Sequence, residues 1–493
     1  MSTIPFQQIP SNLRVPLFYA EVNNSQANTG GQNQRALIIG QITSAGQAVP
    51  NVPLRCLSPS DAIVQGGAGS MLALMAQAYL ANDSFGEIWY LPLSDAGGST
   101  AATGSVVFTA SPTGAGTISL YIAGQLISVA VTAAETVTAI ATAVAAAINA
   151  MTSLPVTATP SSGTVSLTAI NKGLCGNDID IRMNYVGAAN NEATPAGLTY
   201  TITAMASGAT NPTLTTGLAN LNNKSFDFIA SPYTDSTSIT ALTAFLNDST
   251  GRWSWQNQIY GHVFMASRGT TGTLATLGTG LNDQHSSIMG FNDSPTPNWI
   301  WAAALAGAAA ASLKVDPAMP LQTVPIYGVL APPLASRFAL SAQNTLLYDG
   351  ISTFTVQAGV VYIQNLITTY QKNGSGVADN SYLQIETMFT LMYVLRALQT
   401  VVTSKYARVK LAANGTRFAP GSAIVTPNVI RGDLIAQYHQ LEFDGFVQNA
   451  AAFADGLIVQ QNTTNPNRVD VLYPAILIDQ LRVFALLAQF RLI

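Results

Sequence analysis

Ala36-Leu-Ile-Ile-Gly40, Gly66-Gly-Ala-Gly-Ser70 and Ile88-Trp-Tyr-Leu91 are the three segments that decide the fold. The first and the third are short, continuously apolar runs, which is typical of strands buried on both faces. The glycine-rich turn between them leads into an apolar helix expected over 71–80, with Ser70 as its N-cap. The order strand, turn, helix, strand predicts an α/β layer.

The same alternation of short apolar strands and helices returns further along the chain, so we expect one α/β domain built from residues 31–94 and 210–339. Its last helix, Trp299 to Leu313, is an Ala-dominated run of 15 residues, which is too short to span a bilayer and is expected to be buried. Membrane insertion is therefore not predicted. The other elements are strands at 226–230, 262–266 and 286–290 and helices at 238–246 and 272–281.

Residues 95–209 have a different texture and are expected to form an inserted, β-rich outer domain. Apolar runs on both sides of Ala123-Gly124 predict a hairpin, and an Ala-rich helix is expected over 136–151. The remaining expected strands are 156–159 and 164–168, joined as a second hairpin, then 179–185 and 198–205.

Residues 340–493 are expected to form an α+β C-terminal domain. It opens with a predicted hairpin (353–356 and 360–363). Ser381-x-x-Gln384 fits a capping box and predicts that a long helix begins at Ser381. Near the end, 457–461, 469–472 and 481–492 read as strands, and the last could pair outside its own domain.

The first 30 residues are expected to form an N-terminal arm. Pro5, Pro10 and Pro16 disfavour a helix. Residues 14–22 read as a strand, which its proline restricts to a sheet edge or to an added strand. No basic region precedes an apolar core, so we expect no secretory signal.

The chain is poor in charge. Only 9% of its 493 residues are Asp, Glu, Lys or Arg, whereas 48% are hydrophobic; soluble domains average about 25% charged residues. Normal hydrophobicity argues against disorder, and a net charge of −4 argues against nucleic-acid binding. A large, weakly charged surface indicates that partner subunits cover much of it, because interface cores are depleted in charge.

No catalytic, cofactor or metal site is predicted. The Gly66–Ser70 loop lacks the lysine of a P-loop. Gly69-Ser70 is weakly similar to the nucleophile segment of subtilisin-type proteases, but His262, His285 and His439 all lie downstream, contrary to the subtilisin order. The chain is therefore not expected to be an enzyme.

The remaining polar motifs have structural interpretations. Cys56 and Cys175 are expected to be buried thiols. Asp178 and Asp180 are expected on a solvated strand face, with calcium as the alternative. Arg431-Gly-Asp433 precedes a helical pattern and is interpreted as a helix start rather than an adhesion loop.

Charge is unevenly distributed. Residues 396–493 carry nine basic and six acidic groups, and no acid lies between Glu386 and Asp433. A solvated basic face, a docking surface for an acidic partner, or, less favoured, a nucleic-acid site would each fit. The candidate residues are Arg396, Lys405, Arg408, Lys410, Arg417 and Arg431.

Segments spread over nearly the whole chain are similar to the contractile tail sheath proteins of Mu-like bacteriophages. These segments are Ile9–Pro16 with Phe18–Val22, Gly66–Met75, Gly124 with Pro155–Thr159, Gly173–Asp178, Asp349–Phe354, Lys405–Leu411, and Pro466–Asp470 through Leu481–Phe484. The resemblance implies a subtilisin-like middle domain in fold only, since a fold does not carry a function.

The resemblance also implies a structural virion protein, made in the host cytoplasm. It would form stacked, helical six-membered rings around a tail tube, with baseplate and tail terminator proteins as further partners. The sheath would contract to drive the tube through the host envelope. The C-terminal domain would face the tube with the basic candidates above, and the insert would lie outward.

Terminal arms would add strands to neighbouring subunits, with no nucleic acid involved. The candidates for this exchange are Arg14, Val15, Leu17, Phe18, Tyr19, Val22, Val469, Val471, Leu472, Val483 and Phe484. A phage-derived contractile particle without a genome is the alternative. A serine hydrolase and a cell-surface adhesion protein are less favoured.

Overall fold

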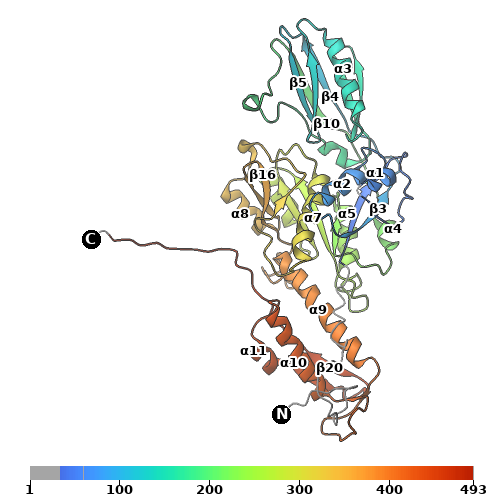
Figure 1. Ribbon diagram of the computed structural model, residues 1–493, viewed down its shortest axis with the longest axis vertical. Helices are drawn as coiled ribbons and strands as arrows, with labels where there is room; N and C mark the ends of the chain where they lie inside the picture. Colours follow the sequence, from blue (N-terminus) through green and yellow to red (C-terminus); the bar gives the residue numbers. More distant parts are fainter. Residues whose placement is uncertain (1–33, 59, 492–493) are drawn as a thin grey trace, which may run out of the picture.

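The computed structural model describes residues 34–58 and 60–491. The expected N-terminal arm, with Arg14, Val15, Leu17, Phe18, Tyr19 and Val22, lies outside these residues. The described chain is elongated and has three levels (Figure 1). We call them the insert (residues 95–209), the central body (residues 34–94 and 210–392) and the lower lobe (residues 394–478).

A six-stranded sheet forms the middle of the central body. Its strand order is β13-β12-β11-β1-β3-β2, and all neighbours are parallel except the edge strand β2, so this is a doubly wound α/β sheet. Nearly every residue of these parallel strands is buried, as their continuous apolar runs predicted. The strands are β1 (Arg35–Gln41), β2 (Leu54–Arg55), β3 (Glu87–Leu93), β11 (Phe228–Ala230), β12 (His262–Arg268) and β13 (Ser286–Phe291).

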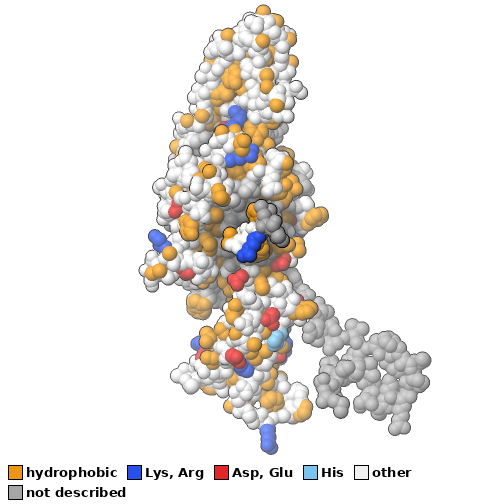
Figure 2. Space-filling model, turned by 90° about the vertical axis from the view of Figure 1, so that its left-hand side faces the viewer, with side chains coloured by type: hydrophobic (Ala, Val, Ile, Leu, Met, Phe, Trp, Pro, Cys, Tyr) orange, Lys and Arg blue, Asp and Glu red, His pale blue; other side chains and the backbone are white. Residues whose placement is uncertain are grey.

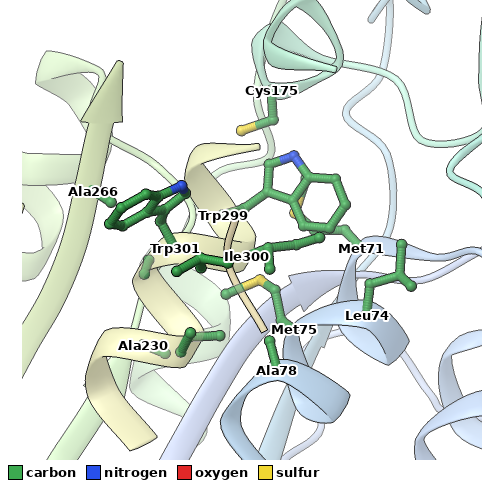
Figure 3. Close-up of a cluster of buried hydrophobic side chains, with 14 of the residues drawn as sticks. Met71, Leu74, Met75, Ala78, Cys175, Ala230, Ala266, Trp299, Ile300 and Trp301 are labelled. Carbon is green, nitrogen blue, oxygen red and sulfur yellow. The ribbon is translucent and has the colours of Figure 1, made fainter. Parts of the chain in front are cut away.

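Two helices, α2 (Met71–Leu80) and α7 (Asn298–Leu313), pack against each other in this body. Met71 and Met75 of α2 lie beside Trp299 and Ile300 of α7 (Figure 3). The contact needs Gly307, because a Cβ there would lie 2.5 Å from the Tyr79 carbonyl oxygen. The buried helix predicted over 299–313 is thus confirmed. The other helices here are α1 (Asp61–Gly66), α4 (Thr215–Ala219), α5 (Ser236–Leu246) and α6 (Thr271–Thr279).

The insert contains two sheets and one helix, α3 (Val137–Ala150). Both predicted hairpins are present; Ala123 and Gly124 have φ values of 52° and 80°, which suit a tight hairpin turn. The strands are β4 (Thr103–Ala110), β5 (Gly116–Ile122), β6 (Gln125–Val131), β7 (Val156–Ser161), β8 (Thr164–Ala169), β9 (Ile181–Met183) and β10 (Thr199–Ala206), in the orders β10-β4-β8-β7 and β6-β5-β9. Strand β4 was not predicted.

A short neck joins the insert to the central body. Thr100 and Ala209 form an antiparallel bridge, with N–H to carbonyl distances of 3.2 and 3.3 Å. The two chain crossings are therefore hydrogen-bonded to each other where the insert begins and ends.

Residues 321–384 belong with the central body. The sheet β14-β16-β15 and helix α8 share its core, and the Ser352 N–H donates to the Ile288 carbonyl at 2.8 Å. The packing therefore differs from the expected domain boundary at residue 340. The elements are β14 (Pro325–Ile326), η3 (Leu334–Ser336), α8 (Leu340–Tyr348), β15 (Thr353–Gln357) and β16 (Val360–Asn365).

The change of core occurs inside one helix, α9 (Ile385–Tyr406), which runs from the central body into the lower lobe (Figure 1). Met392 still packs in the first core, whereas Val394 packs in the second. Among the described residues, α9 alone has the length and composition of a membrane span, but its first half lies in the core. The expected capping box is wrong: the Ser381 hydroxyl donates to Asp379 at 2.6 Å, and the helix begins four residues later.

The lower lobe has its own small core, in which Tyr438 and Phe453 stack with ring centroids 3.7 Å apart. Arg431-Gly-Asp433 lies within α10, one turn after its N-cap Thr426, so the helical interpretation is confirmed. The elements are β17 (Lys410–Leu411), β18 (Ile424–Val425), α10 (Pro427–Phe443), α11 (Ala450–Gly456), β19 (Ile458–Gln461) and β20 (Val469–Leu472).

Candidate functional site

Ser70 has the structural role that its position predicted. Its side chain is buried, and its Oγ accepts a hydrogen bond from the Ala73 N–H at 3.2 Å. The nearest hydrogen-bond partners of the buried histidines lie elsewhere: His262 pairs with Ser287 at 2.8 Å and His285 with Asp248 at 2.9 Å. Burial lowers the pKa of His262 well below its usual value. In the described part of the chain, these hydrogen bonds assemble no Ser–His pair around Ser70.

A polar cavity of about 340 Å³ lies beyond the carboxyl ends of β11 and β12, where doubly wound sheets commonly bind ligands. The insert closes it from one side through the 3₁₀ helix η1 (Leu174–Asp178). Its two carboxylates are already hydrogen-bonded within the chain: Asp178 accepts from the Arg268 Nε at 2.5 Å, and Asp235 accepts from the Ser238 N–H at 3.0 Å. The cavity is therefore part of the joint between insert and body.

Asp178 and Asp180 are not on a solvated strand face, because Asp178 ends η1 and its side chain is only 15% exposed. Burial raises the pKa of Asp178, while Arg268 opposes that rise. Asp180 pairs with Arg182 at 2.5 Å. Over residues 34–58 and 60–491, the structure has no cluster of three or more His, Cys, Asp or Glu side chains suited to a metal ion.

The two cysteines differ in environment. Cys175 is buried beside Trp299, as expected (Figure 3). Cys56 is only partly buried, because it follows the two-residue edge strand β2. Burial raises the pKa of both thiols, which disfavours a reactive thiolate.

Two members of the basic cluster are held inside the chain. Arg396 forms an ion pair with the buried Asp227 at 2.5 Å, and its side chain is only 12% exposed. Arg431 donates to the carbonyl oxygens of Ala454 and Leu457 at the end of α11. The expectation that these two residues face a partner is therefore corrected, because their guanidinium groups already stabilise the protein itself.

The other basic candidates gather where α9 ends. Lys405 is half-exposed and pairs with Asp433 at 3.0 Å. Arg408, Lys410 and Arg417 are exposed after the end of α9, with Lys410 at the start of β17 and the two arginines in loops. Figure 2 shows Lys or Arg side chains at the tip of the lower lobe, and few charged side chains on the upper levels. The lower lobe thus presents a small basic tip.

The strand candidates of the C-terminal region separate into two groups. Val469, Val471 and Leu472 lie on β20, which pairs with β19 of the same chain, Val459 opposite Val471. These residues are therefore engaged internally rather than free for exchange. Within the described chain, the outer edges of this two-stranded sheet pair with no other strand.

Val483 and Phe484 lie in a C-terminal tail, residues 479–491, which extends away from the body (Figure 1). The strand expected over 481–492 is not formed within the chain over its described residues. The exposed apolar side chains occupy both faces that an extended chain would present: Leu481 (68%), Val483 (80%), Phe484 (81%), Leu486 (77%), Leu487 (83%) and Phe490 (85%). So much exposed apolar surface marks an interaction site.

The Mu-like prophage FluMu tail sheath protein of Haemophilus influenzae is 40% identical over 493 residues, which cover 99% of this chain and 100% of that protein. The chain belongs to the phage tail sheath family. Two family models agree: the phage tail sheath protein central domain matches residues 207–369, and the phage tail sheath C-terminal domain matches residues 377–491.

Solved structures of sheath tail proteins are similar over most of the chain. The protein from Desulfitobacterium hafniense is 12% identical with a TM-score of 0.49, covering 94% of this sheath protein and 97% of the other chain. The protein from Listeria innocua is 13% identical with a TM-score of 0.47, covering 91% and 92%.

The resemblance found in the sequence is thus confirmed, and this sheath protein is a structural component of a contractile phage tail. Its mixed α/β, multidomain architecture also agrees with the expectation. Sequence reasoning found the tail through Val483 and Phe484. It did not find the internal partners of Arg396 and Arg431, which lie far away in sequence or are backbone atoms.

Proposed function

We propose that this sheath protein polymerises into stacked six-membered rings around a tail tube, and that residues 481–491 join one copy to the next. The observation that carries the proposal is the tail itself, because it exposes apolar side chains on both faces and pairs with no strand of its own chain over its described residues. A strand of this kind is stabilised by joining the edge of another sheet.

The open edges of the β19–β20 hairpin in a neighbouring copy are the proposed acceptor. Backbone hydrogen bonds would hold the added strand, and the lower-lobe core would cover one of its faces. Val469, Val471 and Leu472 then belong to the acceptor, whereas Val483 and Phe484 belong to the donor. The N-terminal candidates from Arg14 to Val22 remain proposed donors of a second arm.

The three levels suggest how a copy is oriented. We place the basic tip (Lys405, Arg408, Lys410 and Arg417) toward an acidic tube and the insert outward. The insert and the central body carry few charged residues, which suits broad interfaces whose neighbouring copies slide past each other during contraction. The doubly wound sheet is compatible with a subtilisin-like domain, used here without catalysis.

Contraction would then be a change between two packings of the same interfaces, with the energy held in the lattice. A baseplate protein would release the extended state, and a terminator protein would close the far end. The same subunit chemistry would serve a phage or a genome-free contractile particle, and synthesis in the host cytoplasm fits either.

Deleting residues 483–493 should leave a folded monomer that forms no sheath tubes. The deletion removes most of the exposed apolar tail and keeps both cores and the Arg482–Glu386 ion pair. Electron microscopy and sedimentation would measure assembly, and circular dichroism would measure folding. The matched control is Leu57→Asn, which removes an equally exposed apolar side chain (80%) from the central body and should not affect folding. Tubes of normal length from the truncated chain would contradict the proposal.

Substituting glutamate for Arg408, Lys410 and Arg417 should prevent the sheath protein from assembling on the tail tube. Sheath polymers without a tail tube inside them should still form. The reason is that like charges would face the acidic tube, whereas the proposed contacts between copies use the tail and the β19–β20 hairpin. Co-sedimentation with purified tail tubes, at low and high salt, is the measurement. Lys172→Glu with Lys372→Glu is the control, since both lysines are exposed away from the tip. Unchanged tube binding by the triple variant would remove the tip from the tube interface.

A further inference from the structure

The tail is fastened at two successive places before it leaves the molecule. Residues 476–479 lie on the lower lobe: the Ile478 N–H donates to the Phe446 carbonyl at 3.1 Å, and the Gln448 side chain donates to Asp479 at 3.1 Å. Leu481 and Arg482 instead touch the central body. Only Gln480 separates the two attachments, so the chain crosses between the two cores at this point.

The second attachment is a buried ion pair. The Arg482 Nη2 donates to the Glu386 Oε2 in the first turn of α9. The Glu386 side chain is 0% exposed and the Arg482 side chain 15%, in contrast with the 80% and 81% exposure of the next two residues. Arg482 is therefore a partly buried point of attachment between the exposed Leu481 (68%) and Val483.

Neighbouring contacts complete the attachment. The other oxygen of Glu386, Oε1, accepts from the Leu321 N–H at 2.8 Å, and the Gln322 side chain donates to the Leu481 carbonyl at 3.3 Å. The carboxylate thus links the loop after α7, the start of α9 and the tail.

We infer that Arg482 and Glu386 form a clasp that sets where, and in which direction, the intersubunit tail leaves the protein. The clasp lies at the joint between the central body and the lower lobe, beside the helix that connects them. A load on the tail from a neighbouring copy is therefore transmitted to the first turn of α9 and not to the lower lobe alone. Arg482 is a positioning residue in this role, and the inference rests on the proposed function of the tail.

The Arg482–Glu386 ion pair is also of a kind that can open and form again. The Nε and Nη1 groups of Arg482 are buried and lack hydrogen-bond partners in the described structure. An ion pair with unsatisfied donors recovers only part of the cost of removing its charges from water. Such a contact holds the tail in one direction in the free subunit and can yield when the lattice rearranges.

Arg482→Met together with Glu386→Gln is the decisive test in the full-length chain. Glutamine keeps an oxygen that accepts from the Leu321 N–H, and the pair leaves no unpaired buried charge, so the thermal unfolding temperature should stay close to that of the unmodified protein. The concentration needed for tube formation should rise at least about tenfold, because each tail must be captured without a fixed direction.

Arg482→Lys serves as the conservative variant. A lysine ammonium can still pair with Glu386, although as a point charge rather than a planar donor, so assembly should lie between that of the unmodified protein and the double variant. Sedimentation at a series of protein concentrations measures tube formation by the unmodified protein, by Arg482→Lys and by the double variant.

Normal assembly of the double variant would overturn the clasp, even if deletion of 483–493, which keeps Arg482, abolishes tubes and so upholds the tail. If the deletion itself leaves tubes intact, the proposed function of the tail fails. The two results are therefore distinguishable.

Discussion

Arg396→Met is expected to lower the free energy of unfolding by about 3–5 kcal/mol at neutral pH, the range for removing one partner of a buried ion pair. Asp227, its partner, immediately precedes β11 and is 1% exposed. Methionine keeps an apolar stem against the Tyr260 ring, over which the guanidinium now lies at 5.7 Å. The loss therefore comes from the charge of Asp227, for which only the Arg35 N–H, at 3.3 Å, and the more distant charge of Lys314 would remain as compensation.

The loss should depend on pH in a defined direction. Burial already raises the pKa of Asp227, and Arg396 opposes that rise. Without Arg396, the pKa of the folded state rises further above the unfolded value. A carboxyl group of this kind is tolerated when protonated and loses stability as pH rises above the unfolded pKa. The deficit of Arg396→Met should thus be smaller near pH 4.5 than at pH 7.5.

Urea unfolding followed by tryptophan fluorescence at both pH values measures this effect, because all five tryptophans lie in the central body. The matched control is Arg396→Met with Asp227→Asn, in which no buried charge remains and most of the lost stability should return. A single variant as stable as the unmodified protein at pH 7.5 would show that the pair does not hold α9 to the sheet.

Trp301→Ala is expected to cost about 3–5 kcal/mol, the range for removing a buried aromatic side chain. Trp301 is 0% exposed, stacks on Phe291 with centroids 4.7 Å apart, and donates from its Nε1 to the Ser294 Oγ at 3.1 Å. Figure 3 shows Trp301 at the start of α7, with its ring beside Ala266 of β12. Its removal leaves a cavity that the sheet cannot close.

Two control variants test whether the loss of stability comes from removing a buried ring. Trp301→Phe keeps an aromatic ring and should lose much less stability, whereas Trp255→Ala removes a tryptophan that is 76% exposed and should change the unfolding midpoint little. The denaturation midpoint by circular dichroism is the measurement, since fluorescence changes in each variant. Equal midpoints for Trp301→Ala and Trp255→Ala would contradict the assignment of Trp301 to the core.

The parts of the fold that follow from local sequence were predictable. Helix α2 has the predicted bounds because Ser70 caps it and all its residues except Gln77 are apolar. Strand β4 was missed because Thr103-Gly-Ser105 contains weak strand formers, and its partners β8 and β10 are distant in sequence. The start of α9 was misplaced because Ser381 bonds Asp379 instead of the helix backbone.

The exposure of the candidate residues was predictable only where no residue distant in the sequence pairs with them. Val483 and Phe484 were chosen from an apolar run at the end of the chain; the structure shows that they are exposed, and their exchange between copies stays a prediction. Arg396 belonged to the same basic run as Arg408, yet its ion pair reaches back 169 positions to Asp227. Charge clustering along a sequence cannot reveal such a partner.

The neck at Thr100 and Ala209 has an evolutionary consequence. Because the two crossings are bonded to each other, the insert begins and ends at one place, and further contacts such as the Arg268–Asp178 ion pair hold it on the central body. The two family models match residues 207–369 and 377–491, so residues 95–206 of the insert lie outside both. A segment that enters and leaves the central body at one hydrogen-bonded place can change in sequence while the order of the strands in the central sheet stays the same.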